Sequence, residues 1–184
     1  MTPQEIPNSV SSATAAHTFT ARDVVEILRE QGWLVADTSP AQFAWCERAA
    51  ALLGPQVTER RSLAELLHPV FQYNAQELLS KVESHAVLAR YAARDVLRHL
   101  ALLLLDGTPL TSERFKEVVT ALKDRVGIGS REIFHPIRLA LTGRAGEGEL
   151  DRVILLLDEA AAASFAVPVK SARERILEFC AALD

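Results

Sequence analysis

Residues that begin and end helices recur along most of this chain, and they limit its fold more than any other feature of the sequence. Thr20, Ser39, Asn74 and Thr111 each offer a side-chain oxygen that can cap a helix, and Gly or Pro follows several of the segments that they begin. The spacing predicts helices over residues 21–31, 40–53, 62–67, 74–82, 85–105, 112–125, 130–141, 148–163 and 168–183. Few aromatic residues occur, and no pair of alternating segments is joined by a hairpin turn. The sequence therefore predicts an all-α, multi-helix bundle.

The segment from residue 85 to 105 has the clearest helical period. Its apolar residues recur at steps of three and four and predict one buried stripe, formed by Ala89, Ala92, Ala93, Val96, Leu100, Leu103 and Leu104. Arg90, Arg94 and Arg98 recur every four residues along another side of the same helix. Such a row is typical of a solvated face, but it also suits contacts to phosphates, and the sequence leaves both interpretations open.

We expect a flexible N-terminal tail over residues 1–17, a helical subdomain over 18–110 and a second helical subdomain over 111–184.

The first residues have neither a basic segment nor an apolar one, so they do not form a signal peptide. The most apolar stretch contains four or five charged or titratable residues, which argues against a membrane span. Cys46 and Cys180 are the only cysteines and indicate two reduced thiols in the cytoplasm.

The net charge of −4 conceals an uneven distribution along the 184 residues. Residues 1–56 have a net charge of −3, residues 57–144 have 13 basic and 10 acidic side chains, and residues 145–184 have a net charge of −4. The middle of the chain is therefore basic between two acidic flanks. Ten of the 13 basic residues there are arginines, which suit bidentate contacts to phosphates or bases.

One segment indicates a particular protein family more specifically than the residues that begin and end helices. It runs from Arg131 to Arg144 and reads REIFHPIRLALTGR, and it is followed by Glu149-Leu150-Asp151 and an apolar run. An upstream block, residues 59–66, reads ERRSLAEL. Together these blocks resemble the carboxy-terminal region of bacterial glutamate–tRNA ligases over about residues 46–183. The chain departs from the family pattern at Gly148, which lacks a following proline, and at Asp158, where the family often has glycine.

The resemblance implies an all-helical cage that binds the anticodon arm of tRNA. It also implies a class I synthetase relation, but the HIGH-like and KMSKS-like signatures of the catalytic Rossmann domain do not occur in this chain. No phosphate-binding loop, nucleophile motif or metal-ligand spacing occurs either. The sequence thus predicts no catalytic residue, no cofactor and no metal site, and enzyme activity of this chain on its own is not expected.

Arg138 stands inside the apolar part of this block, where a charge is costly unless it is paired or faces a ligand. Two roles stay open for it: a structural tie between helices, or direct contact with RNA.

Our first hypothesis is a non-catalytic tRNA-binding module whose partner is tRNA, of the glutamate type by resemblance. The candidate RNA contacts are Arg60, Arg61, Arg90, Arg94, Arg98, Arg138 and Arg144. The alternative is a helical protein-interaction or regulatory module that has the fold but no longer binds RNA, with a protein as its partner. The acidic flanks and the two altered positions motivate this alternative.

Overall fold

The computed structural model describes residues 18–35 and 37–184, and the predicted tail over residues 1–17 lies outside them. Helices account for all of the regular structure in this part of the chain, which contains no strand. The all-α prediction is therefore confirmed. The helices are α1 Ala21–Glu30, α2 Pro40–Leu53, α3 Arg60–Phe71, α4 Ala75–Leu79, α5 Val82–Leu88, α6 Ala93–Leu104, α7 Ser112–Val126, α8 Ser130–Thr142, α9 Glu149–Ile154, α10 Leu157–Ala162 and α11 Ala172–Leu183, with a short 3-10 turn at Gly54–Gln56.

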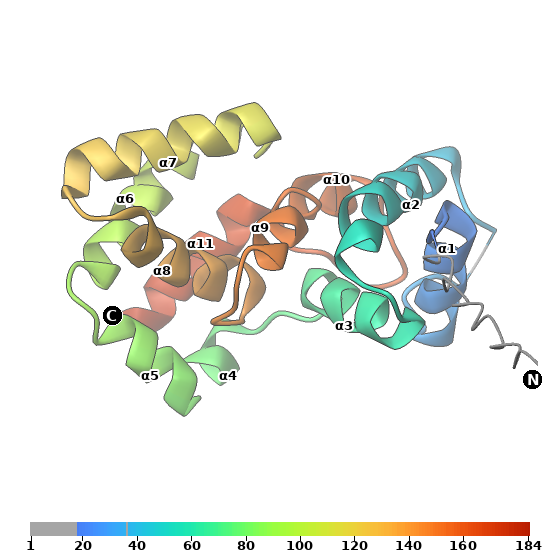
Figure 1. Cartoon of the computed structure of the whole chain (residues 1–184), viewed down its shortest axis with the longest axis horizontal. Coiled ribbons are helices and arrows are strands. Elements are labelled where there is room, and N and C mark those ends of the chain that lie inside the picture. The colour runs from blue at the N-terminus through green and yellow to red at the C-terminus, as the bar shows by residue number, and fades with distance from the viewer. Residues whose placement is uncertain (1–17, 36) are drawn as a thin grey trace, which may run out of the picture.

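The helices form an elongated arrangement with α1 to α3 at one end and α4 to α8 at the other (Figure 1). The last three helices lie between these two ends and connect them. α9 packs on α2, α3 and α8, and α10 packs on α2. α11 packs on α4, α6 and α8. The buried side chains of all these helices belong to one continuous apolar cluster. The boundary that we proposed at residue 110 stays a prediction.

The helix caps lie where the sequence places them. The hydroxyl of Thr20 accepts a hydrogen bond from the backbone N–H of Asp23, and Ser39 does the same for Gln42. Asn74 and Thr111 cap α4 and α7 in the same way. Local side-chain chemistry therefore fixes where these helices begin.

The single helix that we predicted over residues 85–105 is wrong. The chain instead forms α5 and α6, separated by a turn at residues 89–92 in which Ala92 takes the left-handed conformation with φ of 59°. The break allows α5 to pack on α8 while α6 packs on α7, α8 and α11, which one straight helix could not do. Within the described residues, no helix has both the length and the apolar character needed to cross a membrane.

Four other predicted helices have different bounds. The helix predicted over 74–82 is shorter, because α4 ends at Leu79 and α5 begins at Val82. α3 continues through Pro69 to Phe71, although we expected it to end at residue 67. The helix predicted over 148–163 is divided into α9 and α10, and the last helix begins at Ala172 rather than at residue 168. The start of α11 is set locally, because Ser171 and Glu174 form a capping box there. α9 and α10 differ in their packing, since α9 contacts α2, α3 and α8 and α10 contacts α2.

Candidate nucleic-acid interface

A buried arginine joins the ends of three helices. Arg175 on α11 is only 1% exposed, and four of its five N–H groups donate to backbone carbonyls. The acceptors are the carbonyls of Lys170 at 3.0 Å, Pro69 at 2.7 Å, Leu141 at 2.8 Å and Val70 at 2.6 Å. Three of these carbonyls belong to the last turns of α3 and α8, where the helix dipole is negative. Arg175 therefore holds α3, α8 and α11 together.

The Arg175 guanidinium also lies over the ring of Tyr73, with 4.6 Å between its Cζ atom and the ring centroid. Burial lowers the pKa of Arg175 to about 10, so the side chain keeps its charge at neutral pH. The sequence analysis missed this residue. The sequence spacing could have indicated that Arg175 is buried. It lies on the same helix face as Ala172, Ile176 and Phe179, which are all buried.

A second buried arginine holds the loop that follows α8. The side chain of Arg138 donates to both carboxylate oxygens of Asp151 on α9, at 2.7 and 2.8 Å, and to the carbonyl of Gly146 at 3.1 Å. Its Cζ atom lies 5.1 Å from the centroid of the Phe134 ring. These contacts favour the structural role of the two that the sequence leaves open, and a direct contact with RNA stays a prediction.

The loop itself begins at Gly143, which ends α8 with φ of +74°. A side chain at this position would also meet a neighbour, because an added Cβ would lie 2.7 Å from Cδ2 of Leu78. The N–H of Gly143 donates to the carbonyl of Leu139, and the N–H of Arg144 donates to the hydroxyl of Thr142. Glycine thus permits the sharp turn that carries the chain out of α8.

The loop forms one wall of a groove of about 510 Å³. The other walls come from α3, the start of α5 and the start of α9, and the lining residues are Leu66, Lys81, Glu83, Gly143, Arg144, Ala145, Gly146, Glu147, Glu149 and Leu150. Lys81 and Arg144 supply positive charge, the glutamates supply hydrogen-bond acceptors, and the leucines supply apolar surface. Such a lining suits a ligand that has an anion, polar edges and a flat apolar face.

Burial and nearby cations lower the pKa values of two histidines beside this groove. Burial lowers the pKa of His68, and the charges of Arg144 and Lys81 lower it further. Burial likewise lowers the pKa of His135, with further lowering by Arg90, Arg138 and Arg131. Glu147 has the opposite effect on the pKa of His135, so cations and a carboxylate lie together around α8 and the loop that follows it.

The structure does not bring all seven candidate arginines to this groove. Arg144 lines it, whereas Arg60 is held in ion pairs with Glu26 and Glu30 of α1, at 3.0 and 2.8 Å. Arg61 is highly exposed and lies 3.5 Å from Glu65. Lys81, which belongs to the basic middle of the chain, is the groove cation absent from our list.

The row of Arg90, Arg94 and Arg98 that we predicted on one helix is divided by the break before α6. Arg90 lies in the turn, and its charge adds to the effect of burial in lowering the pKa of His135 on α8. Arg94 and Arg98 instead line a small cleft against the end of α11. Arg98 also lies 3.7 Å from Asp95. The first member of the row therefore faces different neighbours from the other two.

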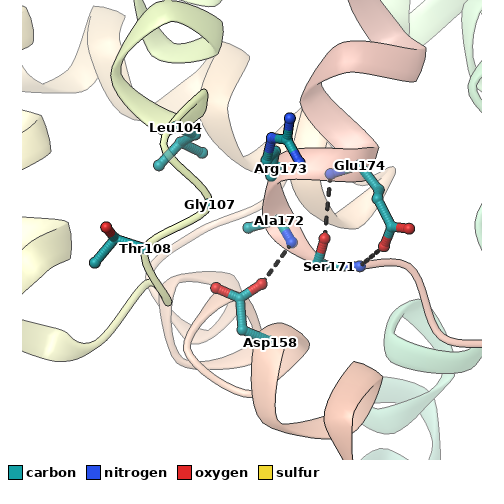
Figure 2. A pocket seen from close by; sticks show the side chains of 8 residues that line it. All are labelled: Leu104, Gly107, Thr108, Asp158, Ser171, Ala172, Arg173 and Glu174. Atoms are coloured by element: carbon teal, nitrogen blue, oxygen red, sulfur yellow. Dashed lines mark hydrogen bonds between the residues drawn. The ribbon is translucent and has the colours of Figure 1, made fainter.

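A second cavity, of about 260 Å³, lies at the start of α11 (Figure 2). The carboxylate of Asp158 occupies this helix end and accepts the N–H of Ala172 at 2.8 Å and that of Leu110 at 2.6 Å. Glu174 caps the same end through the N–H of Ser171. The N–H groups of Ser171 and Ala172 at this helix end are therefore already paired within the protein. No group of three or more metal-ligating side chains occurs among the residues that the structure describes.

Comparison with known proteins gives a consistent result. Residues 14–162 match a family model described as an anticodon binding domain. The chain is 30% identical to the glutamate–tRNA ligase of Geobacillus stearothermophilus over 130 residues, which cover 71% of this chain and 26% of that protein. It is 28% identical to glutamate–tRNA ligase 2 of Syntrophus aciditrophicus over 123 residues, or 67% of this chain and 25% of that one. The chain thus spans about a quarter of the length of these relatives.

Proposed function

Because the chain belongs to the family of anticodon binding domains, we propose that it is a tRNA-binding module related to glutamate–tRNA ligase. Its partner is the anticodon arm of tRNA, and the similarity to glutamate–tRNA ligases favours a tRNA of the glutamate type. The proposal covers binding in the cytoplasm and leaves out the ligase reaction.

The groove between α3, α5 and the loop after α8 is the observation that carries this proposal. Lys81 and Arg144 line it, and their charges suit phosphate oxygens of a single strand. The carboxylates of Glu83, Glu147 and Glu149 suit the amino groups on the edges of unpaired bases. A groove with cations alone would bind any anion, whereas this one offers partners for both the backbone and the bases.

The fold supports the proposal by keeping the groove in one shape. Arg138 donates to the carbonyl of Gly146 and to the carboxylate of Asp151, so it holds the middle of the loop and the helix that follows it. Arg175 ties together the last turns of α3 and α8, the helices from which Leu66 and the loop reach the groove. RNA would therefore meet a preformed surface, which reduces the entropic cost of binding.

Titration of labelled tRNA tests the proposal directly. We expect the protein to bind glutamate-type tRNA more tightly than a random RNA of equal length, with an affinity that weakens as salt rises. The double variant Lys81→Ala/Arg144→Ala should lower the affinity about tenfold or more and reduce the slope of log affinity against log salt by about 1 to 2. Arg22→Ala is the matched control, since Arg22 is exposed on α1, which contributes no residue to the groove. Absence of binding below about 100 μM at low salt overturns the proposal.

The protein-interaction alternative is not favoured. The acidic flanks that motivate it are partly used inside the fold, because Asp151, Asp158 and Glu178 all accept hydrogen bonds from neighbouring helices or turns.

A further inference from the structure

The turn between α5 and α6 presents an aromatic ring to solvent. Tyr91 is 85% exposed, the largest exposed fraction among the large hydrophobic side chains of the described residues. Its ring stacks on no other ring and its hydroxyl makes no hydrogen bond within that part of the chain. Single exposed apolar residues are common on proteins, so the surroundings of Tyr91 decide whether it has a role.

The backbone of this turn is strained. Ala92 has φ of 59°, a conformation that glycine or asparagine adopts readily and alanine does not. The N–H of Ala93 donates to the carbonyl of Arg90 at 3.2 Å, and the N–H of Val96 donates to the carbonyl of Ala92 at 2.9 Å. These bonds lock the turn, so Tyr91 stands on a fixed base and not on a loose loop.

The charged residues nearest to Tyr91 along the chain are basic. Arg90 precedes it and Arg94 follows it, both exposed and without an ion-pair partner among the described residues, and the next residue, Asp95, pairs with Arg98. Arg131, at the start of α8, is exposed and unpaired in the same sense. An exposed ring beside an unpaired arginine in the same turn is typical of proteins that bind single-stranded nucleic acid.

We infer that the turn at residues 89–92 is a stacking platform for one unpaired base of a bound RNA, with Tyr91 against the base and Arg90 on the adjoining phosphate. The inference rests on the proposed function, and it adds a second contact site outside the groove.

The turn lies close enough to the groove for one strand to reach both. α5 begins beside Lys81 and has seven residues, so at about 1.5 Å per residue its far end lies about 10 Å away. α5 packs on α8, the helix from which the loop of the groove continues, so the turn after α5 and the groove border the same two helices.

Three variants and one spectroscopic probe test the inference. Tyr91→Ala should weaken binding of the anticodon stem-loop RNA by about 5- to 100-fold, which is the usual range for loss of one base–aromatic stack. Tyr91→Phe keeps the ring and should retain the affinity. Leu102→Ala is the matched control, because Leu102 is an exposed apolar residue of α6 at 60% exposure, outside the turn. Thermal unfolding should not change for any of the three, since each side chain is largely exposed.

RNA stem-loops with 2-aminopurine at single unpaired positions provide the readout of stacking. One position should lose fluorescence on binding to the wild-type protein and to Tyr91→Phe, and keep it with Tyr91→Ala. Equal affinities of wild type and Tyr91→Ala overturn the platform while the proposed function stands. If the wild-type protein binds no RNA, the proposed function and the platform are overturned together.

Discussion

Replacing Arg175 by methionine should remove much of the stability of this protein. Methionine has a similar length and no donor, so the four carbonyls that Arg175 contacts would lose their partner in a site that is 1% exposed. Each buried acceptor left without a donor costs about 1–3 kcal/mol, or about 4–12 kcal/mol for four. Removing the buried charge returns several kcal/mol of desolvation. We therefore expect a net loss of about 3–5 kcal/mol, against a total stability of about 5–15 kcal/mol for a natural domain.

Urea unfolding at pH 7, followed by circular dichroism and by the fluorescence of Trp33 and Trp45, measures this loss. Both tryptophans are buried, so their emission reports the core. At about 3 °C per kcal/mol, the melting temperature should fall by about 9–15 °C. Arg173→Ala is the matched control on the same helix, because Arg173 is exposed, and it should change stability by less than about 0.5 kcal/mol.

Arg175→Lys separates charge from geometry. A lysine keeps the positive charge but cannot reach carbonyls of α3, α8 and the segment before α11 in a fixed fork, so it should be almost as unstable as the methionine variant. A loss below about 1 kcal/mol in Arg175→Met would refute the reasoning, since it would show that water or other donors satisfy these carbonyls.

Three other changes test the loop and the titrating groups. Arg138→Met should lower stability by about 2–4 kcal/mol because it breaks a largely buried ion pair, and unchanged tRNA affinity at a lower melting temperature would assign the residue a structural role alone. The free energy of unfolding should decrease as the pH falls below 6.5, the ordinary pKa of histidine. The reason is that folding lowers the pKa values of His68 and His135, so the unfolded chain binds more protons there. Urea midpoints at pH 5.5 and 7.5 measure this difference, and equal midpoints would contradict it. Gly143→Ala should cost about 1–3 kcal/mol by strain and contact with its neighbour, whereas Gly148→Ala, with open space around it and negative φ, should be close to neutral in the same unfolding assay.

The sequence predicts the helical class and most helix starts because caps act locally. Thr20, Ser39 and Thr111 need only the next turn of their own helix to accept its N–H groups. Gly143 ends α8 for an equally local reason, since its φ of +74° favours glycine. These features could be predicted because nothing distant changes them.

The candidate site was less predictable. Arg144 is a predicted RNA contact and lines the groove. Lys81 also lines the groove, but it comes there through the packing of α5 on α8. The predicted row of arginines is interrupted at Ala92, where φ is positive and the chain turns between α5 and α6. Both helices pack on α8, but only α6 packs extensively on α7 and α11. A period of 3.6 residues indicates which side chains share a face, and it does not indicate whether the helix continues.

What the sequence determined by itself is therefore the all-helical class, the family resemblance in residues 131–157 and the concentration of arginine in the middle of the chain. The tertiary structure alone decided which of those arginines are buried and which stay exposed. Arg138 and Arg175 both stand on apolar helix faces, and each becomes favourable only because carbonyls or a carboxylate from distant segments surround it. A buried charge is costly without such partners, and partners that are up to 106 residues away can be known only from the packed fold.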